Sequence, residues 1–163
     1  MNQPLEPRAS ISRVYRWRRG LLAVSVVLFA VACVTPALVL HNYMSIFGTW
    51  AGYESIKGGT LLELGLLFGW TKFNFTAFAN FPLWLSWILF ALGRHDWSRK
   101  LSLAALVMSA ETLQLVVQPY VVDEGGVKEG YLVAPHIGFI CWIGSMIVIA
   151  WASQRLVRPN RIT

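Results

Sequence analysis

Residues 101–122 form one long apolar run with a single carboxylate, Glu111, halfway along it. At about 1.5 Å of rise per residue, a helix of this length covers the roughly 30 Å hydrocarbon core of a bilayer. A charged side chain at that depth costs about 2.5–3.5 kcal/mol on insertion scales. The run therefore predicts a membrane-spanning helix, and it requires the neighbouring helices to stabilise Glu111.

The composition also indicates a membrane protein. The chain of 163 residues is 56% hydrophobic and only 13% charged, whereas soluble domains carry about 25% charged residues. The net charge of +6 does not indicate nucleic-acid binding, because most of the Lys and Arg residues flank the apolar runs. We expect one integral membrane domain over residues 1–163, with the lipid bilayer as its surroundings and no nucleic-acid partner.

Four apolar runs predict an all-α fold, a four-helix transmembrane bundle. The predicted spans are Leu21–Leu40, Phe75–Gly93, Leu101–Val122 and Tyr131–Ala152. The first run could instead belong to a cleaved or lipidated N-terminus, but it is longer than the apolar part of a signal peptide. In the second run we expect Pro82 to kink the helix or to follow a non-helical entry, and Asn80 to bond the backbone group that proline leaves free.

The segment 41–74 is predicted to lie on the outer face. Its aromatic residues favour the headgroup layer, and they are Tyr43, Phe47, Trp50 and Tyr53. Thr60 and Glu63 match a capping box at a helix start. The apolar stretch 61–70 that follows is too short to span, so it predicts a short interfacial or re-entrant helix. A plain apolar connector is the alternative.

The basic residues set the expected orientation. Eleven of the 14 Lys and Arg residues lie in the tails 1–19 and 153–163 and in the turn 94–100. The positive-inside rule then places both termini in the cytoplasm and the segments 41–74 and 123–130 outside.

One polar helix face is the candidate functional site. Glu111, Gln114 and Gln118 share a face of the predicted third helix, and His136 is expected at a similar depth to Gln118. Three interpretations remain open. Glu111 carries a proton or cation, or it is a neutral hydrogen-bonding group whose pKa is raised by burial, or it pairs with a basic group of another protein.

A stripe of small residues is the second candidate. Such residues let helix backbones approach closely in lipid, and those on the predicted fourth helix are Ala134, Gly138, Cys141 and Ser145. The stripe predicts packing within the chain or an interface with another subunit. We expect no metal site or cofactor and no catalytic motif, because the three histidines share no ligand spacing and the two cysteines lie inside apolar runs.

The segment from Gly52 to Leu83 ends in Ala79-Asn80-Phe81-Pro82-Leu83, which leads into a predicted span. In this segment most recognisably, and in the order of its features as a whole, the chain resembles small uncharacterised four-span bacterial inner-membrane proteins. The resemblance implies a bacterial inner-membrane location but no activity. We therefore expect a non-enzymatic accessory or interaction subunit of a membrane complex, bound to another membrane protein or to a second copy. The alternative is an oligomeric proton- or cation-coupled transporter or channel that uses Glu111.

Overall fold

The computed structural model describes residues 7–44, 47–68, 76–112, 120–121 and 128–157. Within these residues the fold is mixed α/β, with five α-helices, a short 3₁₀ helix before the third of them, a 3₁₀ turn over residues 110–112 after the fourth, and an antiparallel sheet of four strands. The elements in chain order are α1 (Pro7–Val34), β1 (Pro36–Met44), β2 (Thr49–Lys57), α2 (Gly58–Phe68), η2 (Thr76–Ala79), α3 (Asn80–Ala91), α4 (His95–Ser109), β3 (Tyr120–Val121), β4 (Lys128–Pro135) and α5 (Ile137–Val157).

The predicted all-α four-helix transmembrane bundle is wrong. Two of the described helices are long and apolar enough to cross a membrane, α1 over Arg16–Val34 and α5 over Ile137–Val157. Helix α3 has 12 residues and α4 has 15, fewer than the roughly 20 that a span needs. The apolar runs misled the prediction because two of them contain strands: the first passes into β1, and the last begins in β4.

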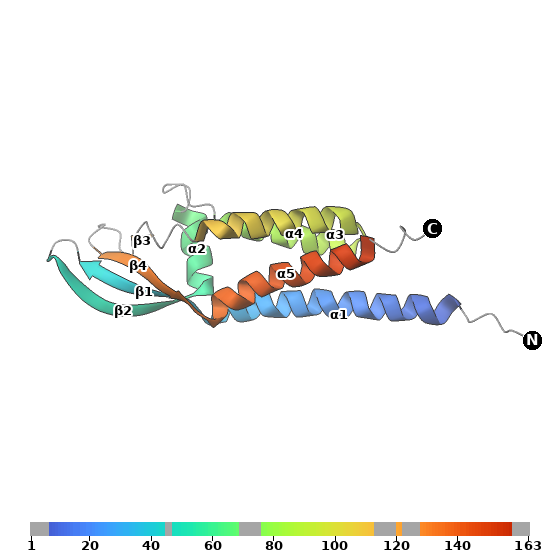
Figure 1. Ribbon diagram of the computed structural model, residues 1–163, viewed down its shortest axis with the longest axis horizontal. Helices are drawn as coiled ribbons and strands as arrows, with labels where there is room; N and C mark the ends of the chain where they lie inside the picture. The colour runs from blue at the N-terminus through green and yellow to red at the C-terminus, as the bar shows by residue number, and fades with distance from the viewer. Residues whose placement is uncertain (1–6, 45–46, 69–75, 113–119, 122–127, 158–163) are drawn as a thin grey trace, which may run out of the picture.

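The helices and the sheet occupy opposite ends of the molecule (Figure 1). Helix α5 packs against α1 and α4, and α4 packs against α3. The sheet continues the long axis beyond the end of α1 and the start of α5, while α2 runs across that axis at the junction (Figure 1). The α3–α4 turn lies at the end away from the sheet.

The change from α1 to β1 has a local cause. A residue that precedes proline is disfavoured in the helical region, so the helix must end before Pro36. Thr35 closes the last turn, because its backbone N–H and its hydroxyl both donate to the Val31 carbonyl, at 3.0 and 2.7 Å. Proline is tolerated as the first residue of a strand, and β1 accordingly begins at Pro36.

The sheet has the strand order β2-β1-β4-β3. Strands β1 and β2 form a hairpin, and β4 pairs antiparallel with the other side of β1. The backbone N–H of His136 donates to the Ala37 carbonyl at 2.8 Å. The start of α5 is therefore tied to the start of β1.

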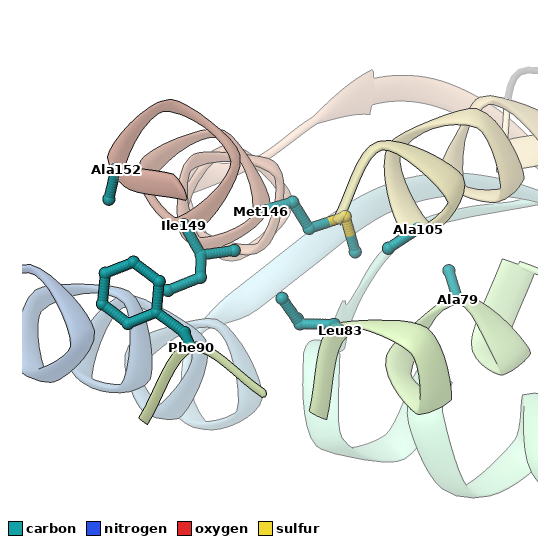
Figure 2. Close-up of a cluster of buried hydrophobic side chains, with 7 residues drawn as sticks. All are labelled: Ala79, Leu83, Phe90, Ala105, Met146, Ile149 and Ala152. Carbon is teal, nitrogen blue, oxygen red and sulfur yellow. The ribbon is translucent and has the colours of Figure 1, made fainter. Parts of the chain in front are cut away.

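The core of the helical end is built from alanine and larger apolar side chains (Figure 2). Its fully buried members are Ala79, Leu83, Phe90, Ala105, Met146, Ile149 and Ala152. They come from η2, α3, α4 and α5, which places the centre of this core between the α3–α4 pair and α5.

Buried hydroxyl and indole groups join the helices. The Ser25 hydroxyl donates to the Ser145 carbonyl at 2.7 Å and accepts from Trp87 Nε1 at 2.8 Å. Ser98 Oγ and Ser153 Oγ share a hydrogen bond at 3.0 Å. Short polar side chains of this kind allow close helix contact and satisfy one another where water is excluded.

The predicted role of Pro82 also needs correction. Helix α3 begins at Asn80, so Pro82 lies in its first turn, where an intrahelical N–H bond is not required and no kink is needed. The Asn80 amide donates to the Ala77 carbonyl at 2.7 Å, and its oxygen accepts from Trp142 Nε1 at 2.8 Å. Asn80 thus links η2 and α5.

Candidate functional site

The most distinctive surface of the described chain is an aromatic cluster on one face of the sheet. We call it the aromatic face, and it consists of His41 and Tyr43 from β1, Trp50 and Tyr53 from β2, and Tyr131 from β4. The His41 ring stacks on Trp50 at 4.1 Å and on Tyr53 at 4.4 Å, with interplanar angles of 18° and 16°. Tyr43 and Tyr131 contact Trp50 edge-on, at 5.2 and 5.7 Å between ring centroids.

A β-bulge brings these rings together. Side chains alternate between the two faces of a regular strand, so Trp50 and Tyr53, three residues apart, would point to opposite sides. The register skips Ala51, pairing Gly52 with Asn42 and Trp50 with Tyr43. An extra residue of this kind restores both rings to one face. Gly52 has a φ of +99°, a left-handed value that favours glycine.

The two faces of the sheet are covered differently. Leu38, Leu40 and Ile56 are buried on the opposite face, against Leu61 of α2 and Phe139 of α5. On the aromatic face, Trp50 is 56% exposed and Tyr53 is 70% exposed. Exposed aromatic side chains gathered in one place indicate a contact surface, since folding has already filled the core on the other side.

The predicted polar face around Glu111 is arranged differently from the expectation. Helix α4 begins at His95 and ends at Ser109, so Glu111 lies in the 3₁₀ turn over residues 110–112 that follows the helix, partly buried, rather than halfway along a span. Gln114 and Gln118 lie outside the described residues. His136 is exposed in the link between β4 and α5, not within a helix.

The small-residue stripe is divided between two elements. Ala134 belongs to β4, where it pairs with Val39. Gly138 and Ser145 are buried in α5, and Cys141 is partly buried. A Cβ atom on Gly138 would lie 2.8 Å from the Pro36 carbonyl oxygen, so the absence of a side chain here permits close contact with the α1–β1 junction.

The predicted capping box does not begin its helix. Helix α2 starts at Gly58, two residues before Thr60, so Thr60 lies inside the first turn and not at the N-cap. Both Thr60 and Glu63 are exposed. The short helix itself forms close to where the sequence predicted it, but it packs against the end of α1 and against η2.

Among the residues that the structure describes, no group of three or more His, Cys, Asp or Glu side chains is placed to hold a metal ion. The histidines are separated: His41 lies in the aromatic face, His95 in the first turn of α4 and His136 before α5. Cys33 and Cys141 are free thiols.

Basic residues gather at the end of the molecule away from the sheet, where α1 starts, the α3–α4 turn lies and α5 ends (Figure 1). We call this end the basic end. The Arg18 guanidinium donates to the Ala91 carbonyl, at the end of α3, at 3.0 Å. Asp96 pairs with Lys100 at 2.9 Å and with Arg99 at 3.4 Å. The hydrogen bond from Lys100 lowers the pKa of Asp96, while burial, and then the charge of Arg18, lowers the pKa of His95.

The sequence interpretation missed the aromatic face because it treated residues 41–74 as a loop at the membrane surface. The residues from Leu38 to Tyr43 do not alternate between apolar and polar types, so the sequence hides the alternation of buried Leu38, Leu40 and Asn42 with partly exposed residues that the structure shows. Alternation with period two is typical of a half-buried strand.

Comparison with known proteins adds no relative from which function could be transferred. No protein-family model matches the chain, and neither a curated protein nor a solved structure matches it.

Proposed function

We propose that this protein is a non-enzymatic interaction subunit of a membrane complex, whose long helices α1 and α5 cross a bacterial inner membrane and whose sheet contacts the outer part of another membrane protein. The exposed aromatic face is the observation that carries the proposal. The alternative of a proton- or cation-coupled transporter that uses Glu111 stays a prediction of the sequence.

The outer surface of the helices supports the membrane location. Large apolar side chains are exposed on all four helices of the helical end, among them Val27 (59%), Ile88 (56%), Val107 (73%) and Ile140 (60%). Only 11% of the apolar stretch of α1 is buried inside the protein, and only 33% of that of α5. A core helix of a soluble protein would be mostly covered by its own chain, whereas these helices need another apolar environment, which lipid provides.

The tryptophans of the basic end support a membrane boundary there. Trp17, Trp97 and Trp151 are exposed at this end, and exposed tryptophans favour the level of the headgroups. From Trp17 to Val34, α1 rises about 26 Å, close to the thickness of a bilayer core of about 30 Å. The basic residues favour the cytoplasm for this end, so the sheet would stand on the outer side.

The height of the aromatic face argues for a protein partner rather than lipid. His41 and Tyr43 follow Pro36 by five and seven residues, which corresponds to about 17 and 23 Å along an extended strand. The headgroup layer is only about 5–8 Å deep on each side. Because the sheet continues the long axis of the helices (Figure 1), these rings would stand beyond the headgroups, contrary to the level expected from the sequence.

The size of the face indicates which kind of protein it contacts. The aromatic face covers three neighbouring strands over about 20 Å of their length, which is an area of roughly 300 Å². This area is well below the area that each partner buries in a stable interface in solution. Tyr and Trp contribute disproportionately to binding, but so small a surface binds weakly on its own. A partner held in the same membrane has a high effective concentration, which makes this contact sufficient.

Site-specific photocrosslinking in cells tests the proposal. A photoreactive phenylalanine at Tyr53 should give a discrete adduct with a second membrane protein, identified by mass spectrometry. The same group at Thr60, which is exposed on α2, is the matched control and should give little of that adduct. In a chain with the probe at Tyr53, Trp50→Ser should reduce the yield several-fold. Equal labelling at both positions, or an adduct with a second copy only, would overturn the proposal.

A further inference from the structure

We propose that the seam between α1 and α5 at the basic end binds the headgroup of an anionic phospholipid through Arg155, Trp151 and Trp17. This inference depends on the membrane location proposed above but not on the aromatic face, so a failed crosslinking experiment at Tyr53 would leave it standing.

The geometry of the three side chains prepares a phosphate contact. Trp17 and Trp151 meet edge to face, with 5.7 Å between ring centroids and an interplanar angle of 64°. The Arg155 guanidinium carbon lies 5.4 Å from the centroid of Trp151. A guanidinium placed over an aromatic ring is held by cation–π attraction, and its N–H groups remain able to bind a phosphate through two bonds.

The charge around the seam favours an anion. Asp96 forms ion pairs with Arg99 and Lys100, and Arg155 takes part in neither. Asp96 is also the only acidic side chain described at the basic end. The exposed basic side chains at this end are Arg16, Arg19, Arg94, Lys100 and Arg155. This excess of positive charge attracts anionic headgroups.

The order of side chains along α5 matches the order of chemical groups in a phospholipid. Ile147, Trp151 and Arg155 are exposed and spaced by four residues, so they lie on one helix face. Moving toward the basic end, this face changes from aliphatic to aromatic to cationic. An acyl chain, a glycerol ester and a phosphate follow one another in the same order, with the Trp ring at the interfacial level.

Helix α1 presents the same order in its own direction. Trp17 and Val24 are seven residues apart, nearly two turns, and both are exposed. Since α1 and α5 run in opposite directions (Figure 1), each places its tryptophan at the basic end and an aliphatic side chain deeper. The two tryptophans, which contact each other, therefore offer a shared surface for one lipid.

Native mass spectrometry of the full chain in mild detergent tests this binding. With equal amounts of phosphatidylglycerol and phosphatidylcholine, the parent protein should retain mainly phosphatidylglycerol. Arg155→Gln should weaken that binding about five-fold, the factor equivalent to about 1 kcal/mol per basic residue near an anionic surface. Arg155→Lys keeps the charge but loses the planar group, so its affinity should be intermediate.

Lys57→Gln is the matched control. It removes the same charge from an exposed residue at the end of β2, far from the seam (Figure 1), and should leave phosphatidylglycerol retention unchanged. Near-UV circular dichroism of each variant checks that the fold is intact. Equal retention of the two lipids, an unchanged affinity in folded Arg155→Gln, or full displacement of the lipid by millimolar inorganic phosphate would overturn the proposal.

Discussion

Replacing Gly58 with alanine should weaken the junction between the helical end and the sheet. Gly58 is the first residue of α2 and follows β2 directly. A Cβ atom there would overlap the Ala32 carbonyl oxygen and lie 2.9 Å from the Ala32 carbonyl carbon. Both atoms belong to the backbone of α1, so no side-chain rotation can relieve the overlap. The Gly58 N–H also donates to the Thr35 carbonyl at 3.1 Å.

The expected loss of stability is about 2 kcal/mol. Forcing extra volume into a close-packed site typically costs about 1–3 kcal/mol, and displacing α2 from α1 would also weaken the Gly58–Thr35 hydrogen bond, whose net value is about 0.5–1.5 kcal/mol. Alanine gains back up to about 1 kcal/mol because it favours the helix more than glycine does. The repulsive effects exceed this gain.

Thermal unfolding in detergent micelles, followed by circular dichroism, measures the effect. For a chain of this size, a loss of about 2 kcal/mol corresponds to a decrease in melting temperature of roughly 4–8 °C. The control is Gly20→Ala, because Gly20 lies in α1 and a Cβ there would have nothing within 4 Å. That variant should be neutral or slightly stabilised. If Gly58→Ala melts with the parent, the close approach of α2 to α1 is refuted.

Three further changes test other parts of the structure by the same melting experiment. Ser25→Ala removes the donor to α5 and leaves the Trp87 indole without its partner, so it should cost about 1–2 kcal/mol. Ser102→Ala, whose hydroxyl bonds within its own helix, is its control and should cost less. Gly52→Ala should cost about 1 kcal/mol through backbone strain at the bulge, where φ is +99°. Acidification through about pH 6.5 should destabilise the protein through His95: its pKa is lowered by burial, so the folded state binds fewer protons than the unfolded state and stability falls as pH falls. His95→Gln should remove that part of the pH dependence, and an unchanged profile would exclude His95 as its source.

The long apolar helices were the most predictable part of the fold. The apolar part of α1, Arg16–Val34, overlaps the predicted first span, and α5 overlaps most of the predicted fourth span. These segments have enough apolar residues in sequence for hydropathy alone to identify them. The polar and basic residues at their ends also mark where the apolar surface stops.

The sheet was not predictable by the same reasoning, because its central strand lies in an apolar run. In such a run, periods of 2 and 3.6 residues cannot be distinguished by hydrophobicity. Strand β1 is held by β4, about 90 residues later in the chain, and a contact so distant leaves no local pattern. The sequence Thr35-Pro36 was the available sign that the helix ends there.

The position of Glu111 depended on where α4 begins. The sequence interpretation treated residues 94–100 as a turn, because they are polar and charged. In the structure, His95–Lys100 form the first turns of α4. Asp96 favours this start, since a carboxylate near a helix N-terminus interacts well with the helix dipole and pairs with Arg99 and Lys100 one turn later. The α-helix ends at Ser109, and Glu111 lies in the 3₁₀ turn that follows it.

One face of the sheet stabilises it by packing on the helices. The contact that we propose is made by the other face, which carries the aromatic rings. An isolated hairpin is marginally stable in water, but β1 and β2 are supported on their other face by Leu61 and Phe139. The aromatic pairs add only about 0.5–1.5 kcal/mol each beyond the area that they bury. Removing the Trp50 ring should therefore weaken the sheet without unfolding it. A loss of crosslinking in that variant would then report on the partner contact, provided that the variant still melts as a folded protein.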